Sequence, residues 1–253
     1  MLNFYSNNNY VLSTRMQLPK TLYCGTLIKR YKRFLADICL ERGEKITAHC
    51  PNPGRMTGLS NPGSRVWVSC SPNPNRKLPF TLELIEADGG LVGVNTHHPN
   101  KIVREAIEAH KIAQLKGYDS LRTEVKYAER SRVDILLEDE KIGRCWVEVK
   151  NVHLRRDSRE SNGTAEFPDS VTVRGSKHIE DLVDQIKIGD KSVLIFLIQR
   201  MDCRDFRIAR DIDPVYYETL LRGMENGLEV LCFDTNITLS SISLRNSITF
   251  CTT

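Results

Sequence analysis

Two carboxylates and a lysine stand on neighbouring strand-like segments in the middle of the chain. Asp134 lies in one apolar run, and Glu148 and Lys150 lie in the next. Because side chains alternate along a strand, Glu148 and Lys150 share one face. A short polar turn at residues 138–143 predicts a hairpin that brings Asp134 beside Glu148. Burial of such a group is costly unless something compensates the charges, which indicates a functional site.

A hard divalent cation, Mg²⁺ or Mn²⁺, would compensate these charges, since magnesium binds one or two carboxylates and keeps several waters. It could activate water to attack a phosphodiester, with Lys150 stabilising the developing charge. We therefore predict Asp134, Glu148 and Lys150 as catalytic residues and Asp134 and Glu148 as metal ligands. Glu105, at the edge of a helical apolar stripe, is predicted as a further ligand. The alternative is structural: a buried Glu148–Lys150 salt bridge, with Asp134 capping a turn.

The segments around these residues alternate between helix and strand patterns. Helices are predicted over residues 100–116, 175–187 and 214–227, and strands over residues 121–128, 132–138, 144–152, 192–198 and 228–233. The run at 192–198 is apolar on both faces, as in an interior parallel strand. This order predicts an α/β domain with a mixed central sheet over residues 98–253. The polar stretch at 155–163 is predicted to be a mobile loop.

Residues 16–97 show short strand patterns separated by turn residues, without a helix pattern. The strands are predicted over residues 25–30, 31–41, 45–50, 66–71, 80–86 and 91–95. Such a series favours a small closed barrel like the oligonucleotide-binding (OB) fold. Residues 1–15, rich in asparagine, are predicted to be a disordered extension, with Met16 as a candidate start. The predicted fold class is α+β: an OB-fold-like barrel followed by an α/β domain.

Positive charge is concentrated in the N-terminal part of the chain. Residues 1–97 hold 12 Lys and Arg against 6 Asp and Glu, whereas residues 98–253 hold 24 against 26. This distribution favours a polyanionic partner, although a solvated basic surface is the alternative. The residues predicted to bind DNA lie in one basic run, in two polar loops and at a helix start: Lys29, Arg30, Lys32, Arg33, Arg55, Arg76, Lys77, Arg174 and Lys177.

The basic run at residues 29–34 also contains Tyr31 and Phe34. Cations beside aromatic rings suit single strands, because phosphates are neutralised and bases can stack. On a continuous strand, alternation would divide the run between two faces, and Phe34 is predicted to belong to the core. The Arg174–Lys177 segment begins a helix, whose N-terminus attracts phosphate. His178, beside it, is interpreted as an ordinary surface or hydrogen-bonded residue.

Cysteine usage and hydropathy exclude several other classes of protein. The eight cysteines form no C-x-x-C pair and no zinc-like cluster with histidine, which predicts free thiols in a reducing cytoplasm. No run of 18 apolar residues occurs, so we expect no membrane-spanning helix. We also expect no small-molecule cofactor.

The spacing of Asp134 from Glu148 and Lys150, set between two helices, resembles the core of PD-(D/E)xK nucleases, with Val133 in place of the usual proline. The chain also closely resembles the bacterial and archaeal sugar fermentation stimulation protein family from residue 16 to about residue 244. The matching segments are residues 27–37, 49–56, 94–96, 124–127, 167–178 and 199–202. Pro53 stands where that family usually has threonine.

This resemblance implies an OB barrel, a nuclease-like domain, sequence-independent DNA binding and a regulatory part in sugar (maltose) metabolism. It does not establish cleavage. Three hypotheses remain: a DNA-binding regulator, a Mg²⁺- or Mn²⁺-dependent endonuclease, and a sugar-linked regulator that reaches DNA only through a partner. Metal-dependent cutting that disappears in Asp134→Ala would distinguish the second. Failure of the isolated protein to bind DNA at low salt would favour the third.

Overall fold

A computed structural model describes residues 15–127, 132–156 and 163–252. The N-terminal part contains β1 (Met16–Gln17), β2 (Leu22–Tyr31), β3 (Leu35–Leu40), β4 (Lys45–His49), β5 (Arg65–Cys70), β6 (Phe80–Ala87) and β7 (Gly90–Gly93). The rest contains α1 (His98–Glu108), a 3₁₀ turn η1 (Ala113–Leu115), β8 (Ser120–Lys126), β9 (Arg132–Asp139), β10 (Gly143–Val152), β11 (Thr164–Phe167), α2 (Val173–Lys187), β12 (Lys191–Ile198), β13 (Asp205–Ile208), α3 (Pro214–Glu225), β14 (Glu229–Ile237), β15 (Ser241–Ser247) and β16 (Thr249–Cys251).

The N-terminal strands form a closed barrel. Strands β2 to β7 make one six-stranded sheet in the order β4-β3-β2-β5-β6-β7, and an additional parallel pairing of β4 with β6 closes five of them into a ring. Along β3, buried and half-buried residues alternate, so that one face fills the interior with Ala36, Ile38 and Leu40. The predicted OB-fold-like barrel is therefore confirmed.

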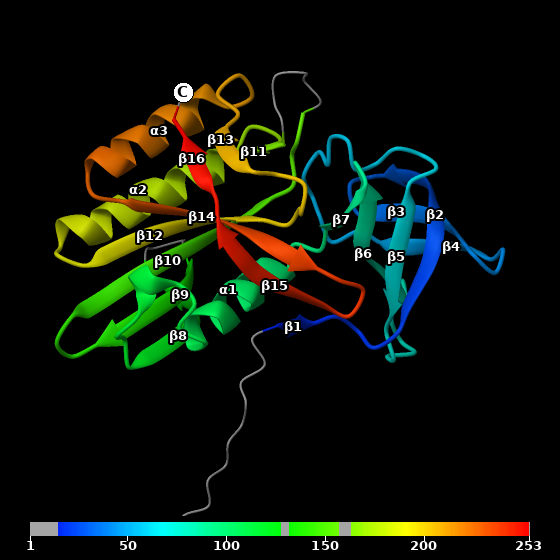
Figure 1. Cartoon of the computed structure of the whole chain (residues 1–253), viewed down its shortest axis with the longest axis horizontal. Coiled ribbons are helices and arrows are strands. Elements are labelled where there is room, and N and C mark those ends of the chain that lie inside the picture. Colours follow the sequence, from blue (N-terminus) through cyan, green and yellow to red (C-terminus); the bar gives the residue numbers. More distant parts are fainter. Residues whose placement is uncertain (1–14, 128–131, 157–162, 253) are drawn as a thin grey trace, which may run out of the picture.

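The second domain is built on a seven-stranded mixed sheet in the order β1-β15-β14-β12-β10-β9-β8. Strands β10, β12 and β14 pair in parallel, whereas β8, β9 and β15 join antiparallel. In Figure 1, α2 and α3 lie side by side on one face of this sheet and α1 lies on the other. The predicted α/β domain with a mixed sheet is confirmed.

Strand β12 lies at the centre of the seven-stranded sheet and contributes side chains to the hydrophobic cores on both of its faces. Val193, Ile195 and Leu197 belong to the core cluster that contains α1, whereas alternate residues of the strand belong to the cluster under α2 and α3. All of its residues after Lys191 are buried. The sequence predicted an interior parallel strand here, and the pairing with β10 and β14 confirms it.

The two domains share contacts along a broad junction. Strand β1 pairs with β15, so Met16 and Gln17 extend the larger sheet, a pairing that the sequence did not predict. Arg200, with only 1% of its surface exposed, forms ion pairs with Asp88 of the barrel and with Asp202. The Arg200–Asp88 ion pair therefore links the barrel to the second domain.

Several element boundaries differ from the sequence predictions. The predicted strand at 31–41 is interrupted, because Lys32 and Arg33 adopt positive φ angles of 49° and 66° and turn the chain between β2 and β3. Phe34 was predicted to be a core residue; this was wrong, since 52% of it is exposed. The predicted helix at 100–116 ends at Glu108, with only a 3₁₀ turn beyond it.

The predicted extension at 1–15 lies almost wholly outside the described residues, and so does most of the predicted loop at 155–163. All eight cysteines are free thiols, as predicted. Within the described part of the chain, no helix has the length and apolarity needed to cross a bilayer.

Candidate functional site

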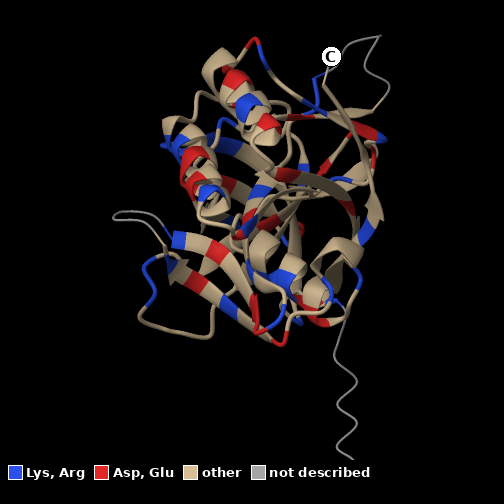
Figure 2. Ribbon diagram, turned by 90° about the vertical axis from the view of Figure 1, so that its left-hand side faces the viewer, with Lys and Arg blue, Asp and Glu red and all other residues tan. Residues whose placement is uncertain are grey.

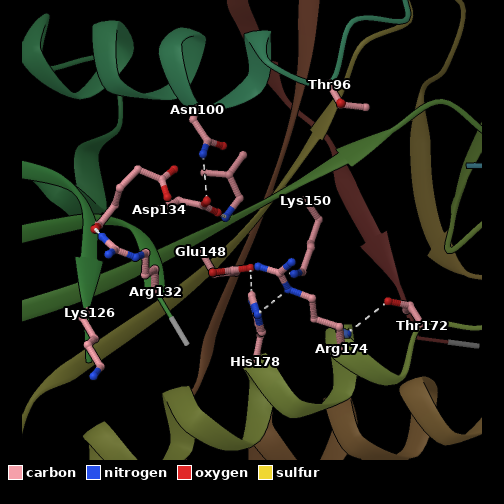
Figure 3. A pocket seen from close by; sticks show the side chains of 13 residues that line it. Thr96, Asn100, Lys126, Arg132, Asp134, Glu148, Lys150, Thr172, Arg174 and His178 are labelled. Atoms are coloured by element: carbon pink, nitrogen blue, oxygen red, sulfur yellow. Dashed lines mark hydrogen bonds and ion pairs between the residues drawn. The ribbon is translucent and has the colours of Figure 1, made fainter. Parts of the chain in front are cut away.

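A cleft of about 590 Å³ opens where β9 and β10 pass between the first turns of α1 and α2. Its lining comes from both helices and three strands: Thr96, Asn100, Glu124, Lys126, Arg132, Asp134, Glu148, Val149, Lys150, Thr172, Arg174, Gly175 and His178. Figure 3 shows Asn100 reaching into it from one helix and His178 and Arg174 from the other. The three predicted catalytic residues therefore meet in one cavity.

Asp134 owes its position to the β9–β10 hairpin. The antiparallel register pairs Ile135 with Val147, so Asp134 and Glu148 are the next two residues that face each other. One oxygen of Asp134 accepts a hydrogen bond from the Val149 backbone at 2.7 Å, and the other accepts one from the Asn100 side chain at 2.7 Å. Burial, reinforced by the negative charge of Glu148, raises the pKa of Asp134 to about 6.

Glu148 is more deeply held, in a chain of polar contacts that includes two cations. Its Oε1 accepts from Lys150 Nζ at 2.6 Å and from His178 Nδ1 at 2.5 Å. Arg174 Nε donates to His178 Nε2 at 3.1 Å, which leaves the Nδ1–H of a neutral imidazole to face the carboxylate. Burial opposes the ionisation of Glu148, but Lys150 and His178 hold its pKa below the usual value.

The structural alternative for this group is met only in part. The Glu148–Lys150 salt bridge exists, with Glu148 buried and Lys150 half-buried. Asp134, however, caps no turn: it lies within β9, and its two hydrogen bonds come from a strand and from a helix. A purely structural role for the group would explain the salt bridge but not the second carboxylate beside it.

The free oxygen of Glu148 bears on whether the cleft could hold a metal ion. Glu148 Oε2 is buried and has no hydrogen-bond partner in the structure. Burial and the Glu148 charge raise the pKa of the neighbouring Asp134. A bound cation would therefore stabilise the ionised form of both carboxylates. Among the described residues no three His, Cys, Asp or Glu side chains cluster closely enough to hold a metal. Protein ligands would therefore be limited to the two carboxylates of Asp134 and Glu148, a set that fits a hard divalent ion whose shell is completed by water.

Glu105, predicted as a further ligand, does not line the cleft. It lies on α1 with its Oε1 at 4.0 Å from Lys101 Nζ, and its Oε2 is buried without a partner. Asn100 of the same helix reaches Asp134 instead. Five residues of an α-helix turn the side chain by about 140°, so Glu105 and Asn100 face different directions. The predicted three-acid group is thus not assembled.

Some cleft residues were not singled out from the sequence. Arg132 lies two residues before Asp134 and therefore on the same face of β9. Strand alternation could have identified it from the sequence. His178, which was interpreted from the sequence as an ordinary surface or hydrogen-bonded residue, lies four residues after Arg174 and on the same face of α2. Lys126 and Glu124, close together on β8, complete that side of the cleft. The position of Asn100 depends on how α1 packs, which no local pattern reveals.

The predicted DNA contacts of the barrel fall into two groups. Arg30 is not available to a ligand in the way that was expected, because its guanidinium donates to the backbone carbonyls of Arg33, Asn52, Gly54 and Arg55. Lys29 forms an ion pair with Asp37, with 3.5 Å between Lys29 Nζ and Asp37 Oδ2.

The other barrel residues predicted to bind DNA are exposed and converge on one end of the barrel. Residues 32–34 form the β2–β3 turn, Arg55 follows β4, and residues 76–77 lie in the β5–β6 loop. Phe34 O accepts from the Cys50 backbone at 2.7 Å, and Arg76 donates to Thr81, the partner of His49 across β4 and β6. Residues 32–34, Arg55 and residues 76–77 are hereafter called the basic barrel end.

Charges on the second domain are more evenly mixed. Figure 2 shows basic and acidic residues interspersed along the helices and strands that face the viewer. Arg174 lines the cleft, whereas Lys177 is exposed on α2 outside it. The predicted cations of α2 are therefore separated, with one inside the cleft and one beyond its rim.

The fold and the cleft together define a class: proteins in which an OB barrel precedes an α/β domain with two carboxylates and a lysine on adjacent strands. The chain belongs to the sugar fermentation stimulation protein family. Residues 97–241 match the sugar fermentation stimulation protein RE domain, and residues 28–94 match the N-terminal OB domain of that family.

Relatives and one solved structure agree with this membership. A sugar fermentation stimulation protein homolog of Paramagnetospirillum magneticum is 50% identical over 92% of this chain and 97% of its own length. The homolog of Rhodospirillum centenum is 52% identical over 92% of this chain and 98% of its own length. The Pyrococcus furiosus SfsA structure, described in complex with Ca²⁺, is 24% identical, covers 93% of this chain and 98% of its own, and superposes with a TM-score of 0.83. That similarity supports the fold.

Proposed function

We propose that the protein binds DNA, independently of base sequence, through the cleft and the basic barrel end. The observation that carries this proposal is the cleft itself, where Lys126, Arg132 and Arg174 surround the Asp134–Glu148 floor. Cations placed in this way suit a polyanion, and the acidic floor suits a cation that would accompany a phosphate. Phosphate contacts position a nucleic acid without reading its sequence, because every nucleotide offers the same group.

A second candidate function, phosphodiester hydrolysis, is favoured by the free Oε2 of Glu148. Asp134 and Glu148 would hold Mg²⁺ or Mn²⁺, which when bound supplies an activated water and neutralises charge on the phosphate. Lys150 lies 2.6 Å from Glu148 and would donate to the attacking oxygen or stabilise the developing charge. The Pyrococcus furiosus SfsA structure is a complex with Ca²⁺, which supports the proposal of a divalent-cation site here.

The name shared by the relatives, sugar fermentation stimulation protein, supports a regulatory role in sugar metabolism for the DNA-binding form. Regulation by sequence-independent binding requires that the protein meet DNA in the cell. Eight free thiols suit a reducing compartment, so we place the protein in the cytoplasm.

The test compares binding with cutting in one set of reactions. Purified protein is incubated with single-stranded and duplex DNA at low salt, in EDTA, Mg²⁺ or Mn²⁺, beside Asp134→Ala and Lys150→Met. The control is Asp184→Asn, an exposed carboxylate on α2 in an ion pair with Lys187. Loss of one electrostatic stabiliser typically slows a reaction by about a hundredfold to a thousandfold.

Metal-dependent nicking that both cleft variants lose and the control keeps supports the hydrolase. Binding by all four proteins without metal-dependent cutting supports the DNA-binding regulator. If the unmodified protein binds neither kind of DNA at low salt, the proposed function is wrong, and a regulator that reaches DNA through a partner takes its place.

A further inference from the structure

One aromatic side chain on the barrel is exposed where the cations gather. Phe34 has 52% of its surface exposed, whereas every other aromatic residue in the described part of the chain is buried or half-buried. Lys32 and Arg33 precede it and are also exposed. The phenyl ring is therefore accessible to a partner at the place where the exposed cations gather.

The turn that presents Phe34 is built from residues that suit it poorly. Lys32 and Arg33 both have positive φ, at 49° and 66°, a conformation in which glycine and asparagine are favoured. Left-handed backbone costs an ordinary residue about 1–2 kcal/mol. A strained pair of cations next to an exposed ring indicates that these side chains are kept for a contact rather than for the stability of the turn.

The turn is also clamped in place. Arg30 donates to the carbonyl of Arg33 at 2.9 Å and to those of Asn52 and Gly54 at 2.8 Å each. The Cys50 backbone donates to Phe34 O at 2.7 Å. Because the β2–β3 turn is tied to the loop after β4 from both sides, Phe34 is held on a rigid support.

The loop that holds this turn lines a second cavity, next to the cleft. Asn52 and Gly54 line a cavity of about 160 Å³ between the domains, together with Thr96 and Asp169. Asp169 Oδ2 accepts from the Met56 backbone at 3.0 Å, so the second domain grips the same loop. Thr96 lines both this cavity and the Asp134–Glu148 cleft. The loop that supports the basic barrel end therefore lines a cavity that shares Thr96 with the cleft.

We infer that Phe34 stacks on an unpaired base, and that the preferred ligand is DNA with a single-stranded segment running from the basic barrel end into the cleft. This inference rests on the proposed function and adds the substrate class. A base in a duplex has both faces covered by its neighbours, whereas a single strand offers them to an aromatic ring. Lys32 and Arg33 stand where the flanking phosphates would lie. In OB folds the loops at this end of the barrel are those that meet oligonucleotides.

The test separates base stacking from phosphate binding. Fluorescence anisotropy in EDTA compares a 20-nucleotide oligo-dT with an abasic strand of the same length and with a blunt duplex. Stacking of one base on an aromatic ring corresponds to about a 5- to 150-fold change in affinity. We expect Phe34→Ala to lose oligo-dT affinity in that range, to change affinity for the abasic strand and the duplex less than about twofold, and to be restored by Phe34→Trp.

The matched control is Ile188→Ala, an exposed apolar residue at the end of α2, which should change none of the three affinities. An equal loss on oligo-dT and on the abasic strand, or no loss at all, overturns the inference while DNA binding stands. If the unmodified protein binds none of the three ligands, it is the proposed function that fails. Unfolding of both alanine variants in urea verifies that each remains folded.

Discussion

The cleft and the basic barrel end handle charge in opposite ways. In the cleft, Glu148 is buried and Asp134 is half-buried, and they accept hydrogen bonds from a helix, a strand and a lysine. At the barrel end, Lys32, Arg33 and Arg55 are exposed on turns. Buried charges are costly and fix geometry, whereas exposed cations contribute long-range attraction at little cost to folding.

This difference separates two properties that a nucleic-acid-binding protein needs. Affinity for phosphate and its salt dependence should depend mainly on the exposed cations, which can be removed one at a time. Dependence on pH and on metal ions should depend on the buried pair. Each prediction below is therefore expected to affect one region and leave the other unchanged.

The largest expected effect is that of salt on DNA binding. If six or more phosphates are neutralised, affinity should fall by about a thousandfold or more between 50 and 200 mM salt. Replacing Lys32, Arg33 and Arg55 by alanine should lower the slope of log affinity against log salt by about 3, since each contact contributes about 0.9 on duplex DNA. Titrations by anisotropy at five salt concentrations measure both slopes. An unchanged slope would remove the barrel end from the interface.

The next effect concerns the pH dependence of stability in the metal-free protein. The folded-state pKa of Asp134 is raised to about 6 from 3.8, so the folded protein binds this proton more tightly than the unfolded chain. The associated stabilisation is complete below about pH 4 and is lost as pH rises through about 6, an effect of about 3 kcal/mol. Asp134→Asn should remove this decrease.

Urea unfolding from pH 4 to pH 8 in EDTA measures the free energy of unfolding of both proteins. Other carboxylates contribute in the opposite sense, so the quantity to compare is the difference between the two curves. A difference that stays constant with pH would mean that Asp134 ionises normally, and the contrast between the two regions would then disappear.

The sequence predicted the part of the site that depends on strands. Alternation placed Glu148 and Lys150 on one face, and the short turn after β9 placed Asp134 beside them. It did not reveal Asn100 as the partner of Asp134 or His178 as the partner of Glu148, because both contacts depend on where two helices pack on the sheet. Local periodicity reports a face and not the tertiary neighbour.

The barrel was predictable in outline, but its functional end was not. Turn signals such as glycine or asparagine were absent at residues 32–33, so residues 31–41 were predicted to form one strand without a turn inside it. The turn that actually forms there moves Phe34 from the expected core to the surface. Short strands such as β11, β13 and β16 were missed because three or four residues give little pattern.

A smaller effect should separate the structural arginine from the exposed cations. Arg30→Met removes a guanidinium that donates to four backbone carbonyls, and hydrogen bonds from charged groups contribute about 1.5–3 kcal/mol each when buried. With water replacing part of these contacts, we expect the free energy of unfolding to fall by about 2 kcal/mol. The control is Lys29→Met on the neighbouring position, whose exposed ion pair should be worth less than about 1 kcal/mol. Equal stabilities in urea would mean that Arg30 does not brace these loops.

The smallest effect tests whether the strained turn is kept for binding. Arg33→Gly and Arg33→Ala remove the same cation, but only glycine accepts a φ of 66° without strain. Arg33→Gly should therefore be more stable than Arg33→Ala by about 1 kcal/mol, while both lower the salt slope of DNA binding by about 1. Arg42→Ala, on the β3–β4 turn at the other end of β3, should leave that slope unchanged. If Arg33→Gly is more stable and still binds DNA with the original salt slope, the strained turn is retained for a reason other than DNA binding.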